Sequence, residues 1–265
     1  MTFNYRLLHF YLYFLLIILN IHCGKTSITF SDNDKIKNEI TDAVHLYSSD
    51  NWENREKAVV SMYKYKDSIF SQNIFLFFLK ATEDRQSSVR IKAIQGLHLM
   101  SDPAAIDRLR DLALADPKKN VRWHALLALG DYSIKENEKI FNESFSSRDW
   151  LIREAAIIGI LKIKDPETQR NNISLIIKAI NDPVISVRLA ALQNIHYKHE
   201  LLYPVIASII NNRKSSPSVL KAALSAINGY RLDYKTRDKL ISMLTHYDRN
   251  IRIMSFRALK DEPEY

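Results

Sequence analysis

The sequence predicts an all-α protein built from stacked helical pairs. The main observation is an internal repeat of about 33 residues, in which most copies carry a β-branched residue, an arginine and, three positions later, a small residue. Gly and Pro are scarce, with 5 and 7 in 265 residues, too few for the many tight turns of a sandwich or barrel. Within each copy the apolar residues also return at helical spacing, which gives each predicted helix a stripe to bury.

The repeat is best seen from its arginine position. In the clearest copy, KNVRWHALLALG at 119–130, Val121 and Arg122 precede Ala125, and apolar residues follow at i+4, i+5 and i+8 from Val121. Seven copies can be aligned, the first of them degenerate. Their residues at this position are Arg55, Arg90, Arg122, Arg153, Arg188, Leu220 and Arg252.

Each copy predicts a first helix, and the stretch after it predicts a second. An opening helix is expected near 35–47. First helices are expected at 53–63, 87–97, 119–130, 150–160, 185–195, 217–227 and 249–259. Second helices are expected at 71–81, 104–114, 136–146, 168–180, 201–211 and 234–244. About fourteen helices in about seven pairs follow, and no pair could bury its stripe without its neighbours.

The Val-Arg-x-x-Ala helix starts and the Asp-Pro turns, such as Asp116-Pro117 and Asp182-Pro183, resemble the HEAT-repeat family in its short, PBS-lyase-like form. The resemblance spans about 51–265 and implies a right-handed α-α superhelix. Leu220 and Ser255 depart from the pattern at the arginine and alanine positions.

The glycines and the arginines both receive structural roles. Gly96, Gly130, Gly159 and Gly229 fall near the ends of first helices, where left-handed caps are expected. The resemblance implies that the arginines pair with acidic or carbonyl groups of adjacent repeats. Five aspartates stand four to six residues ahead of such an arginine: Asp84, Asp116, Asp149, Asp182 and Asp248. We therefore expect a structural ladder, rather than a reader of phosphates, at Arg55, Arg90, Arg122, Arg153, Arg188 and Arg252.

The N-terminus predicts an export signal. Apolar residues run from Phe10 to Leu19, too short to span a bilayer, and the sole cysteine, Cys23, follows in LNIHCG. This segment resembles the lipobox of bacterial lipoproteins, with His22 where a small residue is usual. We expect a signal peptide at 1–22, a lipid-attachment cysteine and tether at 23–34, and the solenoid at 35–265. An uncleaved signal anchor is the alternative. The expected location is the bacterial cell envelope, membrane-anchored on its periplasmic or outer-surface side.

Partner binding is expected on the concave face, which HEAT solenoids line with second helices. The positions opposite each apolar stripe are Lys139, Asn142, Asn171, Lys178, Asn211 and Lys235. A formal net charge of +8 favours an acidic partner. The sequence thus predicts a monomeric, non-enzymatic scaffold for a partner protein with an acidic segment, with no nucleic acid bound.

Two other functions stay open on the same fold. One is a HEAT-like enzyme or nucleic-acid-binding protein, DNA glycosylase-like or bilin-lyase-like; the other is a structural component of an envelope assembly. No phosphate loop, nucleophile elbow or zinc-protease motif occurs in the sequence. His196 and His199 beside Glu200 have metal-ligand spacing, but they stand between two predicted helices and suit a solvated turn. We expect neither cofactor nor metal.

Overall fold

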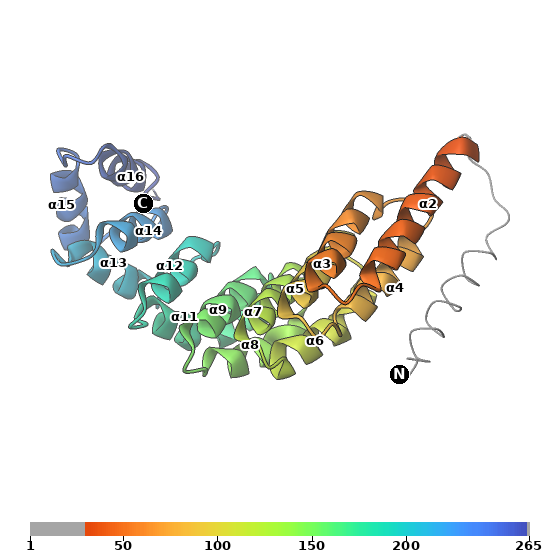
Figure 1. Ribbon diagram of the computed structural model, residues 1–265. Helices are drawn as coiled ribbons and strands as arrows, with labels where there is room; N and C mark the ends of the chain where they lie inside the picture. Colours follow the sequence, from red (N-terminus) through yellow and green to blue (C-terminus); the bar gives the residue numbers. More distant parts are fainter. Residues whose placement is uncertain (1–29, 264–265) are drawn as a thin grey trace. The chain divides into compact units, whose positions relative to one another are not determined.

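The computed structural model describes residues 30–263, and this part of the chain is all-α (Figure 1). It contains fifteen α-helices and three short 3-10 turns. The helices form two compact units, one up to Arg108 and one from Leu109, and α6 (Ile106–Ala115) runs across the boundary. The predicted α-α solenoid is confirmed. Cys23, the signal peptide and most of the tether lie outside the described residues. None of the described helices is long and apolar enough to cross a membrane.

The helices of each unit match the repeat closely. Unit 1 contains α2 (Phe30–Tyr47), α3 (Trp52–Ser61), α4 (Ser71–Ala81) and α5 (Ser87–Met100). The first helices of unit 2 are α7 (Lys119–Asp131), α9 (Trp150–Lys162), α12 (Ile185–Asn194), α14 (Pro217–Ala226) and α16 (Arg249–Lys260). Its second helices are α8 (Glu138–Phe145), α10 (Pro166–Asn171), α11 (Ile173–Ile180), α13 (Tyr203–Asn211) and α15 (Tyr234–Met243).

The expected helix at 168–180 is divided into α10 and α11. Asn172 lies between them with φ −98° and ψ 7°. Its amide nitrogen donates to the carbonyl oxygen of Thr168 at 2.7 Å and to the carboxylate of Glu138 at 2.8 Å. A side chain that bonds its own backbone in this way competes with the regular helix, so the break has a local cause.

The glycines correct a prediction. Of the four, only Gly229 has a positive φ, 72°. Gly96, Gly130 and Gly159 lie inside helices, and Ser101 and Ser133 adopt the left-handed conformation at the ends of α5 and α7, with φ 52° and 51°.

Two of the helical glycines are needed for close packing instead. A Cβ on Gly96 would lie 2.7 Å from the ring of Phe78, and one on Gly159 would lie 2.5 Å from Cδ1 of Phe141. Both phenylalanines are fully buried. Each ring comes from the second helix that precedes the glycine's own helix, so these glycines admit a neighbour and do not terminate a helix.

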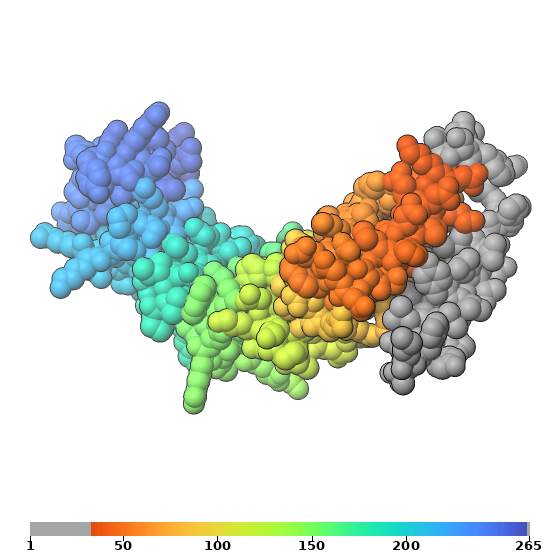
Figure 2. Space-filling view, viewed as in Figure 1, coloured from red at the N-terminus to blue at the C-terminus, as the bar shows by residue number. Residues whose placement is uncertain are grey.

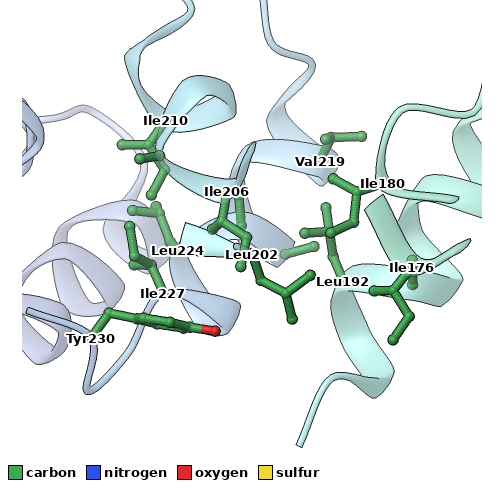
Figure 3. Close-up of a cluster of buried hydrophobic side chains, with 14 of the residues drawn as sticks. Ile176, Ile180, Leu192, Leu202, Ile206, Ile210, Val219, Leu224, Ile227 and Tyr230 are labelled. Atoms are coloured by element: carbon green, nitrogen blue, oxygen red, sulfur yellow. The ribbon is translucent and has the colours of Figure 1, made fainter. Parts of the chain in front are cut away.

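The cores of the two units differ in composition. In unit 1 the rings of Phe77 and Phe78 pack edge-on against Tyr47 and Tyr63, with centroids 5.1 and 5.7 Å apart. In unit 2 aliphatic side chains from successive helices form one continuous cluster, part of which is drawn in Figure 3. Ile176 of α11, Leu192 of α12 and Ile206 of α13 are among its fully buried members. This shared burial fixes which face of each helix stays exposed.

Candidate functional site

The arginine ladder is part of the framework that holds the repeats together. Arg55 of α3 donates from Nε and Nη2 to both carboxylate oxygens of Asp84, at 2.7 and 2.9 Å. Its Nη1 donates to the carbonyl oxygens of Ser49 and Asp50, both at 3.0 Å. One guanidinium therefore binds the turn before its own helix and the turn after the next helix.

The same arrangement recurs in unit 2. Arg153 of α9 donates from Nε and Nη2 to the two carboxylate oxygens of Asp182, at 2.8 and 2.9 Å. Its Nη1 donates to the carbonyl oxygens of Ser147 and Arg148. Arg188 in turn donates to the carbonyl oxygen of Asp182 at 2.7 Å. Bidentate arginine–carboxylate pairs of this kind have short, directional hydrogen bonds, which suits a contact that sets the spacing between repeats.

Four of the five aspartates fall into two groups that the sequence did not separate. Asp84 and Asp182, six residues before an arginine, receive the arginine of the preceding repeat. Asp149 and Asp248, four residues before one, are instead N-caps of their own helices and accept from the N–H groups of Leu151 and Asn250.

The electrostatics of the ladder follow from this geometry. Burial acts to raise the pKa of Asp84 and of Asp182, but the arginine and a backbone N–H outweigh it, so that both pKa values lie below the usual value. Hydrogen bonding to these carboxylates raises the pKa of Arg55 and Arg153. Both pairs therefore stay ionised at neutral pH.

The six residues predicted for partner binding all lie on second helices of unit 2, but they are not equivalent. Lys139 of α8, Lys178 of α11, Lys235 of α15 and Asn171 of α10 are exposed. Asn142 and Asn211 are partly buried. We call the exposed side of α8, α10, α11, α13 and α15 the second-helix face.

Asn211 has a structural role as well. Its amide nitrogen donates at 3.0 Å both to the carbonyl oxygen of Ala207 and to the hydroxyl of Thr236 on α15. Thr236 is fully buried. The side chain thus fastens α13 to α15, and only its carbonyl oxygen remains for a ligand.

The second-helix face carries charges of both signs. Glu143 lies one turn from Lys139, with its carboxylate 3.8 Å from the ammonium group, and exposed Asp238 lies one turn from Lys235. Lys178 has the neutral, exposed Ser174 in the corresponding place. The face therefore offers isolated cations between acidic and neutral groups, and not a continuous basic strip.

A hollow of about 460 Å³ lies on this face between α13 and α15. We call it the α13–α15 hollow, and its lining includes Tyr203, Ser208, Asn211, Asp233 and Lys235. The hydroxyl of Tyr203 donates to the carboxylate of Asp233 at 2.8 Å. Burial raises the pKa of Tyr203, so the hydroxyl keeps its proton.

Sequence reasoning found two members of this hollow, Asn211 and Lys235, and missed Tyr203, Ser208 and Asp233. A signal was present, since Tyr203 and Asp233 are separated by 30 residues, close to one repeat. Because corresponding positions in neighbouring repeats lie side by side, a contact between these two polar residues could have been predicted from their spacing.

The histidines considered as metal ligands make local contacts. His196 Nδ1 lies 3.1 Å from the carbonyl oxygen of Asn194, and His199 Nδ1 accepts from the N–H of Leu201 at 3.2 Å. Both stand in the turn that leads to α13. Across residues 30–263 no group of three or more His, Cys, Asp and Glu side chains is arranged to hold a metal ion.

Comparison with known proteins agrees with this geometry. HEAT repeats are matched at residues 76–141. The solved structure of YibA from Escherichia coli is 18% identical, aligns over 84% of this chain and 82% of its own, and has a TM-score of 0.59.

The structure of the complex of CpcE and CpcF of phycocyanin lyase, from Nostoc sp. PCC7120, is 14% identical. The alignment covers 91% of this chain and 97% of that one, with a TM-score of 0.52. We found no curated protein with significant sequence similarity. Identities this low show a shared fold alone. Together with the helices described above, they establish an α-α solenoid, and HEAT repeats are matched within it at residues 76–141.

Proposed function

We propose that this protein is a non-enzymatic scaffold that binds a partner protein through the second-helix face of unit 2. The observation that carries the proposal is the row of exposed lysines on separate second helices, Lys139, Lys178 and Lys235, of which Lys235 borders the α13–α15 hollow. Side chains fixed on rigid, stacked helices are held at set intervals, which suits recognition of an extended surface.

The chemistry of this face favours a partner with separated acidic residues. Each lysine offers a compact cation on a flexible stem, which steers an acidic segment and adds modest affinity at an exposed site. The hollow adds a hydroxyl, an amide oxygen and the ring of Tyr203 within one repeat. Glu143 and Asp238 would repel a uniformly acidic strip, so the spacing of the partner's carboxylates would give specificity.

The test is photo-cross-linking in the native cells from a benzophenone side chain placed at Ser208, which is exposed and lines the hollow. A matched control places it at Ser225, an exposed serine on the first helix α14. We expect a discrete cross-linked protein from position 208 that is absent from position 225. Equal products from both positions would remove the basis of the assignment.

Charge reversal then tests the lysines. Changing Lys139, Lys178 and Lys235 together to Glu should abolish the cross-link and the salt-sensitive binding of the identified partner. The control variant reverses three exposed lysines elsewhere, Lys57, Lys118 and Lys214. Equal binding by the two triple variants would contradict the role of the second-helix face.

We also propose that the scaffold is held at the bacterial envelope through a lipid on Cys23. The support is the apolar run that ends at Leu19, four residues before this single cysteine. Two or more acyl chains give durable anchoring where one does not. Intact mass of the membrane-extracted protein should show a chain that starts at Cys23 with added acyl mass, lost in Cys23→Ser. A full-length chain without acyl mass would refute lipidation.

A further inference from the structure

The last first helix, α16, exposes a position that is buried in the other well-aligned repeats. This position lies four residues after the arginine position. Its occupants in five other repeats are no more than 1% exposed: Ile94, Leu126, Ile157, Leu192 and Leu224. In α16 the same position is Phe256, which is 57% exposed.

Phe256 is exposed because it lies on the side of α16 that, in the other first helices, is covered by the elements that follow. α16 packs against the preceding helix α15, as α9 packs against α8. In the middle of unit 2, Ile157 of α9 shares a buried cluster with Ile173 and Ile176 of α11, which with α10 forms the second helix of the same repeat. No helix follows α16 among the described residues. Figure 1 shows α16, in blue, at one end of unit 2.

The residues just after α16 lie elsewhere. Glu262 accepts a hydrogen bond from the N–H of Leu232 at 3.0 Å and pairs with Arg237 at 2.5 Å. Asp261 accepts from the amide of Asn228 at 3.0 Å. These contacts hold the chain against the α14–α15 turn and α15, so it does not cover Phe256. In the space-filling view the blue end of unit 2 is open to solvent (Figure 2).

Arg252, the last rung of the ladder, presents to solvent the same kind of edge that Arg55 and Arg153 use for an aspartate. Its Nη1 donates to the carbonyl oxygens of His246 and Tyr247 at 2.7 and 3.0 Å, as the Nη1 atoms of Arg55 and Arg153 do in their own turns. Those two arginines use Nε and Nη2 for an aspartate. Within residues 30–263 no carboxylate forms a salt bridge with Arg252, and the same holds for Arg122 and Arg188, so a carboxylate at this edge is an addition that some rungs have and others do not.

The two aspartates that fill this role for Arg55 and Arg153 each follow closely after a second helix. Asp84 comes three residues after the end of α4, and Asp182 two residues after the end of α11. Each therefore follows the second helix that comes after the arginine's own helix. An occupant of the end of α16 can supply the same two features, a helix with an apolar stripe and a carboxylate just beyond its C-terminus.

The surface around Phe256 is basic as well as apolar. A hollow of about 610 Å³ there is lined by Leu244, Arg252, Ile253, Phe256, Arg257, Lys260 and Asp261. We call these residues the end face. Three cations against one acidic residue, itself bonded to Asn228, attract an acidic ligand.

A second copy of this chain fits the end face poorly. Two end faces placed together would oppose Arg257 and Lys260 to their own copies. The outer side of α2, the helix at the other end of the described chain, exposes polar Asn38, Thr41 and Asp42. If α2 of a second copy packed on the end face, these polar side chains would offer Phe256 no apolar contact. They would also lose their hydration without gaining hydrogen-bond partners, which costs free energy.

We propose that the end face binds an amphipathic helix of a partner protein against the exposed side of α16. The apolar stripe of that helix covers Ile253 and Phe256, and a carboxylate just beyond its C-terminus pairs with Nε and Nη2 of Arg252. Acidic residues on its flanks meet Arg257 and Lys260. This surface is separate from the second-helix face, so the inference stands without the function proposed above.

The test uses a helix that this chain already contains. A fluorescein-labelled, hydrocarbon-stapled peptide copying residues 166–184 carries α10, α11 and the carboxylate of Asp182. Its binding to the purified full chain is followed by fluorescence anisotropy. We expect saturable binding, lost in Phe256→Asp, and weakened about tenfold to a hundredfold by Arg252→Gln, because a charge-assisted pair is removed.

Arg188→Gln is the matched control, because Arg188 makes the same Nη1 contacts to two carbonyl oxygens, at 2.7 and 3.1 Å, inside unit 2. It should bind the peptide as the wild type does. The peptide with Asn in place of Asp182 should bind the wild type as weakly as the unchanged peptide binds Arg252→Gln.

Four results would overturn the proposal. They are no measurable peptide binding, equal binding by the Arg252→Gln and Arg188→Gln variants, self-association in sedimentation velocity that Phe256→Asp abolishes, and flotation with phosphatidylglycerol vesicles that depends on Phe256. The third result would assign the end face to a second copy, and the fourth to a membrane surface.

Discussion

Replacing Asp182 by Asn should loosen the middle of unit 2, because it removes one charge from a buried ion pair. Asp182 accepts from Nε and Nη2 of Arg153 at 2.8 and 2.9 Å and from the N–H of Val184 at 2.8 Å. The side chains of Arg153 and Asp182 are only 13% and 6% exposed. The amide keeps one acceptor oxygen but turns an NH₂ group towards the guanidinium.

The expected cost follows from this burial. Removing one partner of a fully buried ion pair costs about 3–5 kcal/mol, since the other charge is left uncompensated. The slight exposure of Arg153 lets water reach part of the guanidinium, so we expect about 2–4 kcal/mol. The matched control is Glu143→Gln, whose partner Lys139 lies 3.8 Å away in solvent. That substitution should cost less than about 1 kcal/mol.

The assay combines urea denaturation with local hydrogen exchange, because repeat arrays can unfold in parts and a single free energy is then ill defined. Amides of α9, α11 and α12 should exchange faster in Asp182→Asn than in Glu143→Gln. A double-mutant cycle with Arg153→Gln should show that the two substitutions are not additive. Equal urea midpoints for Asp182→Asn and Glu143→Gln, or a double variant with a purely additive loss, would refute the role of this pair.

Two further predictions concern packing and pH. Gly159→Ala should lower the melting temperature, because its Cβ would displace the buried ring of Phe141 at a cost of about 1–3 kcal/mol, against about 1 kcal/mol gained in helix propensity. Adding Phe141→Leu should restore part of the loss, and a Gly159→Ala protein that melts higher than wild type would contradict the packing argument. Since the folded pKa values of Asp84 and Asp182 lie below the ordinary value of about 4, their contribution is present above that pH and is lost as the pH falls through the lower folded values. Urea midpoints should therefore fall on acidification below about pH 4, and fall less in a variant with Asn at both positions; an equal fall in that variant would exclude these carboxylates as the cause.

The sequence by itself determined the architecture, because helical periodicity and repeat spacing are local properties of the chain. The expected second helix at 71–81 coincides with α4, and the first helix at 150–160 falls within α9. The alanine or serine three residues after each arginine is buried in six repeats, as close packing of neighbouring helices requires. The export signal stays a prediction from the sequence.

Only the tertiary structure decided what individual polar and small residues do. Asp84 and Asp149 look alike along the chain, yet one receives an arginine 29 residues away and the other caps its own helix. Gly159 admits the ring of Phe141 from another helix. Asn211 fastens α13 to α15. These roles depend on which helix faces contact each other across repeats. A shift of one or two residues relative to the arginine position is enough to give a side chain different neighbours.

The end face shows the same division. The repeat spacing placed the last first helix near 249–259. The structure alone showed that Asp261 and Glu262 bond to the α14–α15 turn, and that Phe256 is 57% exposed. Periodicity fixes which residues are apolar, but burial is a property of pairs of elements, and so it could be read only from their packing.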